Sequence, residues 1–270
     1  MKIVVTGSAG FVGFHVSMKL LESNHEVLGI DGLTDYYDVN LKKERHKILS
    51  KYEKFVDQEI MLEDFDKLKK IVTEYNPDVI IHLAAQAGVR YSLENPRSYI
   101  DSNIIGTFNI MEISRDIDIK HIMMASTSSV YGANEDMPFT EISNSDVPLT
   151  IYAATKKSIE VMTHSYSNIY DLPTTLFRFF TVYGPWGRPD MALFKFVKLI
   201  LAHEPIDVYN HGNMYRDFTY IDDIVDGIYK LLNKIPSLRS KKKYKKDSLS
   251  PVAPFRILNI GNTKKILLLD

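Results

Sequence analysis

The stretch Gly7-Ser8-Ala9-Gly10-Phe11-Val12-Gly13 decides the fold of this chain. It follows an apolar run at 2–5, which predicts a buried strand, and it opens a segment at 10–22 with the apolar spacing of a helix. Glycines in such a turn let backbone N–H groups approach a pyrophosphate and let the helix pack closely on the strand. The spacing is G-x-x-G-x-x-G. In this context it predicts a dinucleotide-binding turn that involves Gly7, Ala9, Gly10, Phe11, Val12 and Gly13.

An acidic residue at the end of the second strand supports this interpretation. Asp31 follows the apolar run at 26–30 and lies close to the interval of about 20 residues expected after the glycines. A carboxylate there accepts hydrogen bonds from both ribose hydroxyls and repels a 2′-phosphate, so Asp31 favours NAD over NADP. The alternative is a turn aspartate that precedes Gly32.

Short apolar runs alternate with amphipathic segments through the first two thirds of the chain. Such alternation predicts an α/β fold, a doubly wound parallel (Rossmann) sheet with helices on both faces. Further strands are expected at 55–60, 79–83 and 121–125, and further helices at 41–52, 64–75 and 98–115. Residues 1–177 would form this NAD-binding domain.

The pattern changes beyond Arg178, where Gly, Pro and aromatic residues interrupt the alternation. We expect 178–270 to form mainly a smaller C-terminal substrate lobe, with the segments at about 218–233 and 255–262 returning to the first domain. Helices are predicted at 193–202 and 218–233, strands at 206–209 and 256–260, and an exposed loop at the basic run 240–246.

Composition excludes several classes of protein. The 270 residues include 33 Lys+Arg, 34 Asp+Glu and no Cys. The lack of Cys excludes disulfide scaffolds, thiolate metal sites and Cys nucleophiles, and we expect no metal site. The balanced charge argues against a nucleic-acid partner. No apolar run approaches the roughly 20 residues of a membrane helix, and the N-terminus lacks a signal peptide, so we expect a cytoplasmic protein.

Two further motifs carry chemistry. Tyr152 and Lys156 stand four residues apart in an amphipathic segment, so on a helix they share a face, and the cation would lower the pKa of the phenol toward that of a general base. The run Ser126-Thr127-Ser128-Ser129-Val130-Tyr131-Gly132 follows a predicted strand. Ligands bind at that edge of an open parallel sheet. Turn capping is the alternative reading of these hydroxyls.

Together with three longer stretches, these motifs identify a resemblance to a known family. The chain resembles extended short-chain dehydrogenases/reductases of the nucleotide-sugar epimerase/dehydratase group, from Met1 to about Asn262. The most specific stretches are His82-Leu83-Ala84-Ala85-Gln86-Ala87-Gly88-Val89-Arg90-Tyr91-Ser92, residues 178–192 (RFFTVYGPWGRPDMA) and residues 216–223 (RDFTYIDD).

The resemblance implies roles for individual residues. Tyr152 would be the base for the 4′-hydroxyl, Lys156 would tune it and hold the nicotinamide ribose, and Thr127 would hydrogen-bond the reacting oxygen. The implied NAD contacts also include Glu59, Ile60, Leu83, Ala84, Ala85, Asn103 and Phe179. The implied UDP-sugar contacts are Ser128, Ser129, Thr181, Arg188 and, on the pyrophosphate, Arg216.

The implied activity is 4-epimerisation of a UDP-sugar through a transient 4-keto intermediate, with UDP-glucuronate to UDP-galacturonate as the expected reaction. Related decarboxylases and dehydratases carry acidic residues in the loop that follows Thr127. Here that loop has only hydroxyls, at Ser128 and Ser129. This favours epimerisation without elimination. A UDP-glucose or UDP-N-acetylhexosamine epimerase, or an NAD-binding remnant with little activity, remain alternatives.

Two departures from the family and one expected assembly complete these predictions. Relatives place Asp where Glu59 stands, and they continue for several tens of residues beyond Asn262, so we expect the substrate lobe to be C-terminally incomplete. Relatives pair through two helices that correspond to 98–115 and 152–169. We therefore expect a homodimer.

Overall fold

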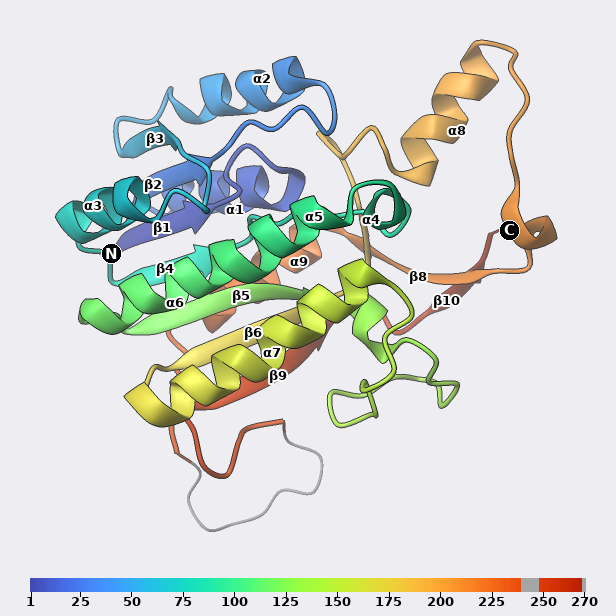
Figure 1. Cartoon of the computed structure of the whole chain (residues 1–270). Coiled ribbons are helices and arrows are strands. Elements are labelled where there is room, and N and C mark those ends of the chain that lie inside the picture. The colour runs from blue at the N-terminus through green and yellow to red at the C-terminus, as the bar shows by residue number, and fades with distance from the viewer. Residues whose placement is uncertain (239–247, 269–270) are drawn as a thin grey trace.

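Seven parallel strands form the main sheet of this computed structural model, which describes residues 1–238 and 248–268 (Figure 1). The strand order is β3-β2-β1-β4-β5-β6-β9. The bounds are β1 (Lys2–Thr6), β2 (Glu26–Asp31), β3 (Phe55–Glu59), β4 (Val79–His82), β5 (His121–Thr127), β6 (Thr174–Phe179) and β9 (Phe255–Ile260). Strands β4 and β5 are buried along their whole length, as their nearly continuous apolar sequences predict. The predicted doubly wound parallel sheet is confirmed.

Helices cover both faces of this sheet, and each face has its own hydrophobic core. Helices α1 (Phe11–Glu22), α2 (Val39–Leu49) and α9 (Ile221–Leu231) cover one face. Helices α3 (Phe65–Tyr75), α6 (Gly106–Asp116) and α7 (Ile151–Tyr170) cover the other (Figure 1). Buried residues such as Phe14 and Ile224 form the first core, and Leu68 and Ile110 belong to the second.

A second, smaller sheet lies beyond the carboxyl edge of the main sheet (Figure 1). It contains β7 (Thr181–Tyr183), β8 (Tyr215–Tyr220) and β10 (Lys265–Leu267), in the order β10-β8-β7. Helix α8 (Ala192–Leu201) follows β7, and Figure 1 shows it standing away from the main sheet. Strand β9 and helix α9, which come late in the chain, join the main sheet and its helical layer.

Three predicted elements differ from the structure. The segment 206–209 forms no strand: residues 204–208 are irregular and mostly exposed, and they pair with no strand in the part of the chain that the structure describes. The predicted helix 218–233 begins only at Ile221, because Phe218, Thr219 and Tyr220 pair with β7 as part of β8. The predicted helix 98–115 is not a continuous α-helix: it consists of α5 (Pro96–Tyr99), the π-helical stretch η1 (Ile100–Ile105) and α6. π-helical turns are rare, and the apolar periodicity used for the prediction is that of an α-helix.

Two further predictions concern the basic run and membrane-spanning helices. The basic run 240–246 lies outside the residues that the structure describes. Of the helices in the described ranges, none is both long enough and apolar enough to cross a membrane.

Candidate functional site

A cavity of about 470 Å³ opens at the carboxyl edge of the main sheet. The ends of β1, β2, β4, β5 and β6 border it, which is where parallel α/β sheets bind ligands. Fifteen of the residues predicted from the sequence line it: Gly7, Gly10, Phe11, Val12, Gly13, Asp31, Ile60, Leu83, Ala84, Ala85, Thr127, Tyr152, Lys156, Phe179 and Arg188. Residues predicted from segments that lie far apart in the chain therefore line one cavity.

The glycine turn is packed so closely that side chains would not fit. Gly7 has a φ of +72°, and a Cβ there would lie 2.7 Å from the backbone nitrogen of Ala84 in the loop after β4. A Cβ on Gly13 would lie 2.0 Å from the carbonyl oxygen of Gly7. The turn therefore places the N-terminus of α1, with its unsatisfied N–H groups, against the cavity.

Two backbone N–H groups hold the carboxylate of Asp31 in place. Its Oδ2 accepts a hydrogen bond from the N–H of Ala9 at 3.0 Å, and its Oδ1 accepts one from Leu33 at 2.9 Å. Ala9 is fully buried and does not line the cavity, so what it contributes is this backbone donor. A carboxylate has about four lone-pair positions, and Asp31 retains acceptor capacity for a ligand.

Two of the residues expected near the cofactor lie outside the cavity lining. Glu59 is exposed at the end of β3, opposite Asp31 in the sheet, while Ile60 beside it is buried and lines the cavity. Asn103 is fully buried in η1, where its amide donates to the carbonyl of Gln86 at 3.1 Å and to Thr155 Oγ1 at 3.0 Å. Asn103 thus ties the loop after β4 to helix α7.

Helix α7 brings the predicted catalytic residues to the cavity. Thr150 caps its N-terminus, accepting from the N–H of Ala153 at 3.1 Å. Tyr152 therefore lies in the first turn, with its phenol near Thr127 at the end of β5. Lys156, one turn later, donates to the carbonyl of Ala125 at 2.8 Å. The predicted shared face of Tyr152 and Lys156 brings both residues to the end of β5.

The expected effect of Lys156 on the pKa of Tyr152 is not what the structure shows. Burial raises the pKa of the Tyr152 phenol, and the neighbouring Thr127 hydroxyl and the charge of Arg188 act against that rise. Burial also lowers the pKa of Lys156 to about 8. The prediction was wrong because helical spacing fixes the shared face but not the lysine's partner, here a backbone carbonyl.

The predicted substrate residues divide into two groups. Arg188 lines the cavity and forms a two-pronged ion pair with Asp190, at 3.0 Å from Nε and 2.5 Å from Nη2. Ser128, Ser129 and Thr181 are partly buried next to the cavity-lining residues Thr127, Phe180 and Val182. Arg216 is exposed on β8 and donates to the carbonyl of Tyr215 at 2.9 Å. The cavity lining therefore includes only Arg188 of this set.

The sequence analysis did not identify two cationic residues on helix α2, Lys42 and Arg45. Arg45 is fully buried and donates to the carbonyl of Ala9 at 2.7 Å, to the hydroxyl of Tyr37 at 2.8 Å and to the carbonyl of Trp186 at 2.6 Å. Lys42 lines the cavity with its Nζ 4.6 Å from the centre of the Tyr37 ring. The sequence does contain a signal for this pair: Lys42 and Arg45 lie one helical turn apart on a polar helix, shortly after Tyr36 and Tyr37.

Comparison with known proteins identifies the family. Residues 3–245 match the model described as the NAD dependent epimerase/dehydratase family. The chain belongs to this family. A protein of Rhizobium meliloti (strain 1021), named as a probable UDP-glucuronate 4-epimerase, is 54% identical over 271 residues, which cover 100% of this chain and 80% of the relative. The resemblance predicted from the sequence is confirmed.

Solved structures give the same result. UDP-glucuronic acid 4-epimerase from Bacillus cereus, crystallised with UDP-glucuronic acid and NAD, matches with a TM-score of 0.87 at 34% identity, over 100% of this chain and 80% of that one. UDP-glucose 4-epimerase from Thermotoga maritima, solved with UDP-glucose, matches with a TM-score of 0.80 at 26% identity, over 100% and 79%. Both confirm the fold of the chain.

The residues present fit the family's cofactor. The glycine turn is packed against its own backbone and the loop after β4 with no room for a Cβ, and Gly7, Gly10 and Gly13 line the cavity at the N-terminus of α1. Asp31 supplies carboxylate oxygens at the end of β2, the position at which a ribose diol is recognised. Apolar residues that follow β4 or end β6, Leu83 and Phe179 among them, line the remainder of the cavity and suit a flat aromatic ring.

Proposed function

We propose that this chain catalyses the NAD-dependent 4-epimerisation of UDP-glucuronate to UDP-galacturonate. One observation carries the proposal: the glycine turn, Asp31, Thr127, Tyr152 and Lys156 border one continuous cavity, so a cofactor site and an acid–base site meet. Relatives named for this reaction, at 54% and 34% identity over the whole chain, support the choice of substrate.

The chain's own residues supply the proton transfer. Tyr152 takes the proton of the sugar 4′-hydroxyl, and Thr127, whose hydroxyl lowers the pKa of that phenol, holds the reacting oxygen. NAD, when bound, supplies the reversible oxidation of C4′. The positive charge of Arg188 favours the phenolate form of Tyr152. After the 4-keto sugar turns about its diphosphate link, Tyr152 returns the proton.

The substrate carboxylate requires a particular environment. A 4-keto uronate is a β-keto acid and loses CO₂ readily, so the protein must hold the carboxylate in place without supplying acid groups. Ser128, Ser129 and Thr181 offer hydroxyls beside Thr127, and Arg188 offers a guanidinium at the cavity. Charge-assisted hydrogen bonds of this kind are about twice as strong as neutral ones.

Two parts of the proposal concern the rest of the molecule. Residues 1–177 with α9 and β9 would bind NAD, and most of 178–270 would hold the UDP-sugar, with Arg216 on the pyrophosphate. We also propose a homodimer formed through α6 and α7. Large apolar side chains there are exposed in the single chain, among them Phe108 at 40% and Val161 at 57%.

Product analysis tests the proposed function. Purified protein is incubated with UDP-glucuronate without added NAD, and the nucleotide sugars are separated. UDP-galacturonate without CO₂ is expected. A UDP-pentose would refute the argument from the hydroxyl-only loop, and turnover of UDP-glucose or UDP-N-acetylglucosamine in place of UDP-glucuronate would favour the alternative substrates. NAD binding without any turnover would identify a remnant.

A further inference from the structure

Glu160 occupies a buried position one turn beyond Lys156 on helix α7. Its Oε1 accepts a hydrogen bond from Ser126 Oγ at 2.6 Å and from Arg178 Nε at 2.8 Å, and its Oε2 accepts from Arg178 Nη2 at 2.8 Å. The side chains of Glu160 and Arg178 are each only 2% exposed. Neither side chain lines the cavity, so the proposed chemistry does not use them directly.

Glu160 completes a series of contacts between α7 and the end of β5. Residues 152, 156 and 160 are spaced four apart and share one face of the helix. Tyr152 lies near Thr127, whose hydroxyl lowers the pKa of the phenol, Lys156 donates to the carbonyl of Ala125, and Glu160 accepts from Ser126. Three successive turns of α7 thus meet three consecutive residues of β5, and the Glu160 side chain itself lies outside the cavity lining.

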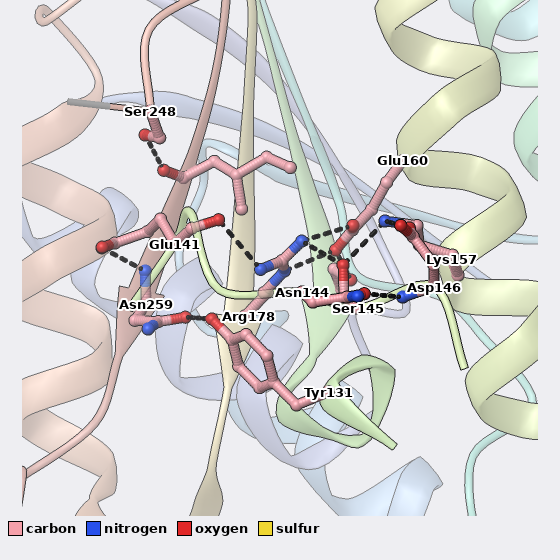
Figure 2. A network of polar contacts seen from close by, with 12 residues as sticks. Tyr131, Glu141, Asn144, Ser145, Asp146, Lys157, Glu160, Arg178, Ser248 and Asn259 are labelled. Atoms are coloured by element: carbon pink, nitrogen blue, oxygen red, sulfur yellow. Dashed lines mark hydrogen bonds and ion pairs between the residues drawn. The ribbon is translucent and has the colours of Figure 1, made fainter. Parts of the chain in front are cut away.

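Arg178 connects this series to the rest of the fold. It lies on β6 directly opposite Ser126 in the sheet. Its guanidinium also donates to the carbonyl of Glu141 at 3.2 Å and lies 4.8 Å from the centre of the Tyr131 ring. Figure 2 shows Arg178 between Glu160 on one side and Glu141 and Tyr131 on the other. The position of Glu160 is therefore fixed by β5, by β6 and by the loop that follows Tyr131.

We propose that Glu160 is a positioning residue for the site, one that sets the register of α7 along β5 so that Tyr152 reaches Thr127 and Lys156 reaches Ala125. The proposal rests on the proposed function, because it assigns Glu160 a purpose only if Tyr152 and Lys156 act as stated. A buried ion pair contributes little net stability compared with apolar residues of similar volume. A defined register is the benefit that such a pair can provide here.

The charge of Glu160 also acts on Lys156. Burial lowers the pKa of Lys156 to about 8, and the Glu160 carboxylate opposes that fall. The other titratable groups around Lys156 are Tyr152 on its own helix and His82 on β4, which burial keeps neutral. Loss of the Glu160 charge therefore lowers the pKa of Lys156 further, and the lysine loses its proton at a lower pH.

Two variants separate the contact from the charge. The double variant Glu160→Gln with Arg178→Met removes both buried charges together, so no unpaired charge is left, while the amide oxygen introduced on α7 can still accept a hydrogen bond from Ser126. Ser126→Ala keeps the carboxylate and removes the contact with β5. Ser114→Ala is the matched control, because Ser114 is a buried serine on α6 whose hydroxyl donates to Ile110.

The pH dependence of kcat and of NAD affinity is then measured for each variant, the latter by calorimetry. For the double variant we expect the basic limb of both profiles to move to lower pH. For Ser126→Ala we expect kcat to fall several-fold, up to about tenfold, while the basic limb of both profiles stays at the pH of the wild-type protein. Ser114→Ala should match the wild-type protein in both measurements.

A double variant whose limbs coincide with those of the wild-type protein, or Ser126→Ala with an unchanged kcat, would overturn the proposal. If the wild-type protein binds NAD but turns over no UDP-sugar, the proposed function fails on its own. The NAD-affinity profile then still decides whether Glu160 acts on Lys156.

Discussion

The phenol of Tyr36 donates a hydrogen bond to Asp190 Oδ2 at 3.1 Å, although 154 residues separate the two in sequence. The same carboxylate holds Arg188 at the cavity, and Arg45 joins the same two segments by donating to the hydroxyl of Tyr37 and to the carbonyl of Trp186. The loop after β2, on the cofactor side, is therefore bonded directly to the segment that leads into α8, on the substrate side.

Replacing Tyr36 with Phe should loosen this connection. A hydrogen bond to a charged group contributes about 1.5–3 kcal/mol net, so we expect NAD to dissociate roughly tenfold faster from Tyr36→Phe. Stopped-flow release of NAD measures this rate. Tyr229→Phe, on α9 and away from the cavity, serves as the control. Equal release rates for the two variants would show that the Tyr36 hydroxyl does not help to retain the cofactor.

A pair of helix glycines tests the close packing of the dinucleotide turn. A Cβ on Gly13 would lie 2.0 Å from the Gly7 carbonyl oxygen, whereas on Gly227 of α9 its nearest neighbour would be an Ile260 side-chain atom at 3.7 Å. Gly13→Ala should therefore abolish measurable NAD binding. Gly227→Ala should bind NAD normally and gain about 0.5–1 kcal/mol from helix propensity. Calorimetry and urea unfolding measure the two effects, and tight NAD binding by Gly13→Ala would contradict the account.

His82 predicts how stability changes in acid. It is buried between Thr6 and Thr107, at 2.7 and 2.9 Å, and burial lowers its pKa to about 3. The unfolded chain protonates this histidine below about pH 6.5. The stability that the neutral, buried His82 contributes is therefore fully present above that pH and is lost as the pH falls toward 3.

Urea unfolding between pH 6 and 4 measures the loss. His82→Gln should flatten the slope by up to about 1.4 kcal/mol per pH unit, at the cost of lower stability at neutral pH. The exposed His211→Gln should leave the slope unchanged. An unaltered slope in His82→Gln would mean that His82 does not cause this loss of stability.

The assignment of the base predicts the behaviour of Tyr152→Phe. Because the phenol oxygen carries the proton and the ring only lines the cavity, we expect turnover to fall below detection while NAD affinity stays within about twofold. Calorimetry and product analysis on the same preparation provide both values. Activity comparable to that of the wild-type protein would remove Tyr152 from this role.

The sequence predicted the parts of the site that depend on strand ends. Glycine spacing, Asp31 at the end of an apolar strand and the hydroxyl run after another all locate the same sheet edge, because parallel strands bring their carboxyl ends together. Apolar periodicity likewise predicted most of the helices and strands. These features are local, and one sequence segment is enough to define each of them.

Features that depend on distant partners could not be predicted. Strand β8 forms because β7 pairs with it, and nothing within Phe218–Tyr220 distinguishes that strand from the start of the helix that follows. The partner of Lys156 is a backbone carbonyl, which no side-chain pattern indicates. The buried pair of Glu160 and Arg178 joins two elements whose register only the folded sheet defines.

The fate of the hydrogen on C4′ tests the central claim most directly. UDP-glucuronate carrying deuterium at C4′ is converted in ordinary water by the wild-type protein, and the product is analysed by mass spectrometry and NMR. We expect UDP-galacturonate that retains the deuterium at C4′, because the hydrogen leaves and returns within the cavity. UDP-galacturonate that has lost the deuterium to solvent, or a decarboxylated UDP-pentose, would contradict it.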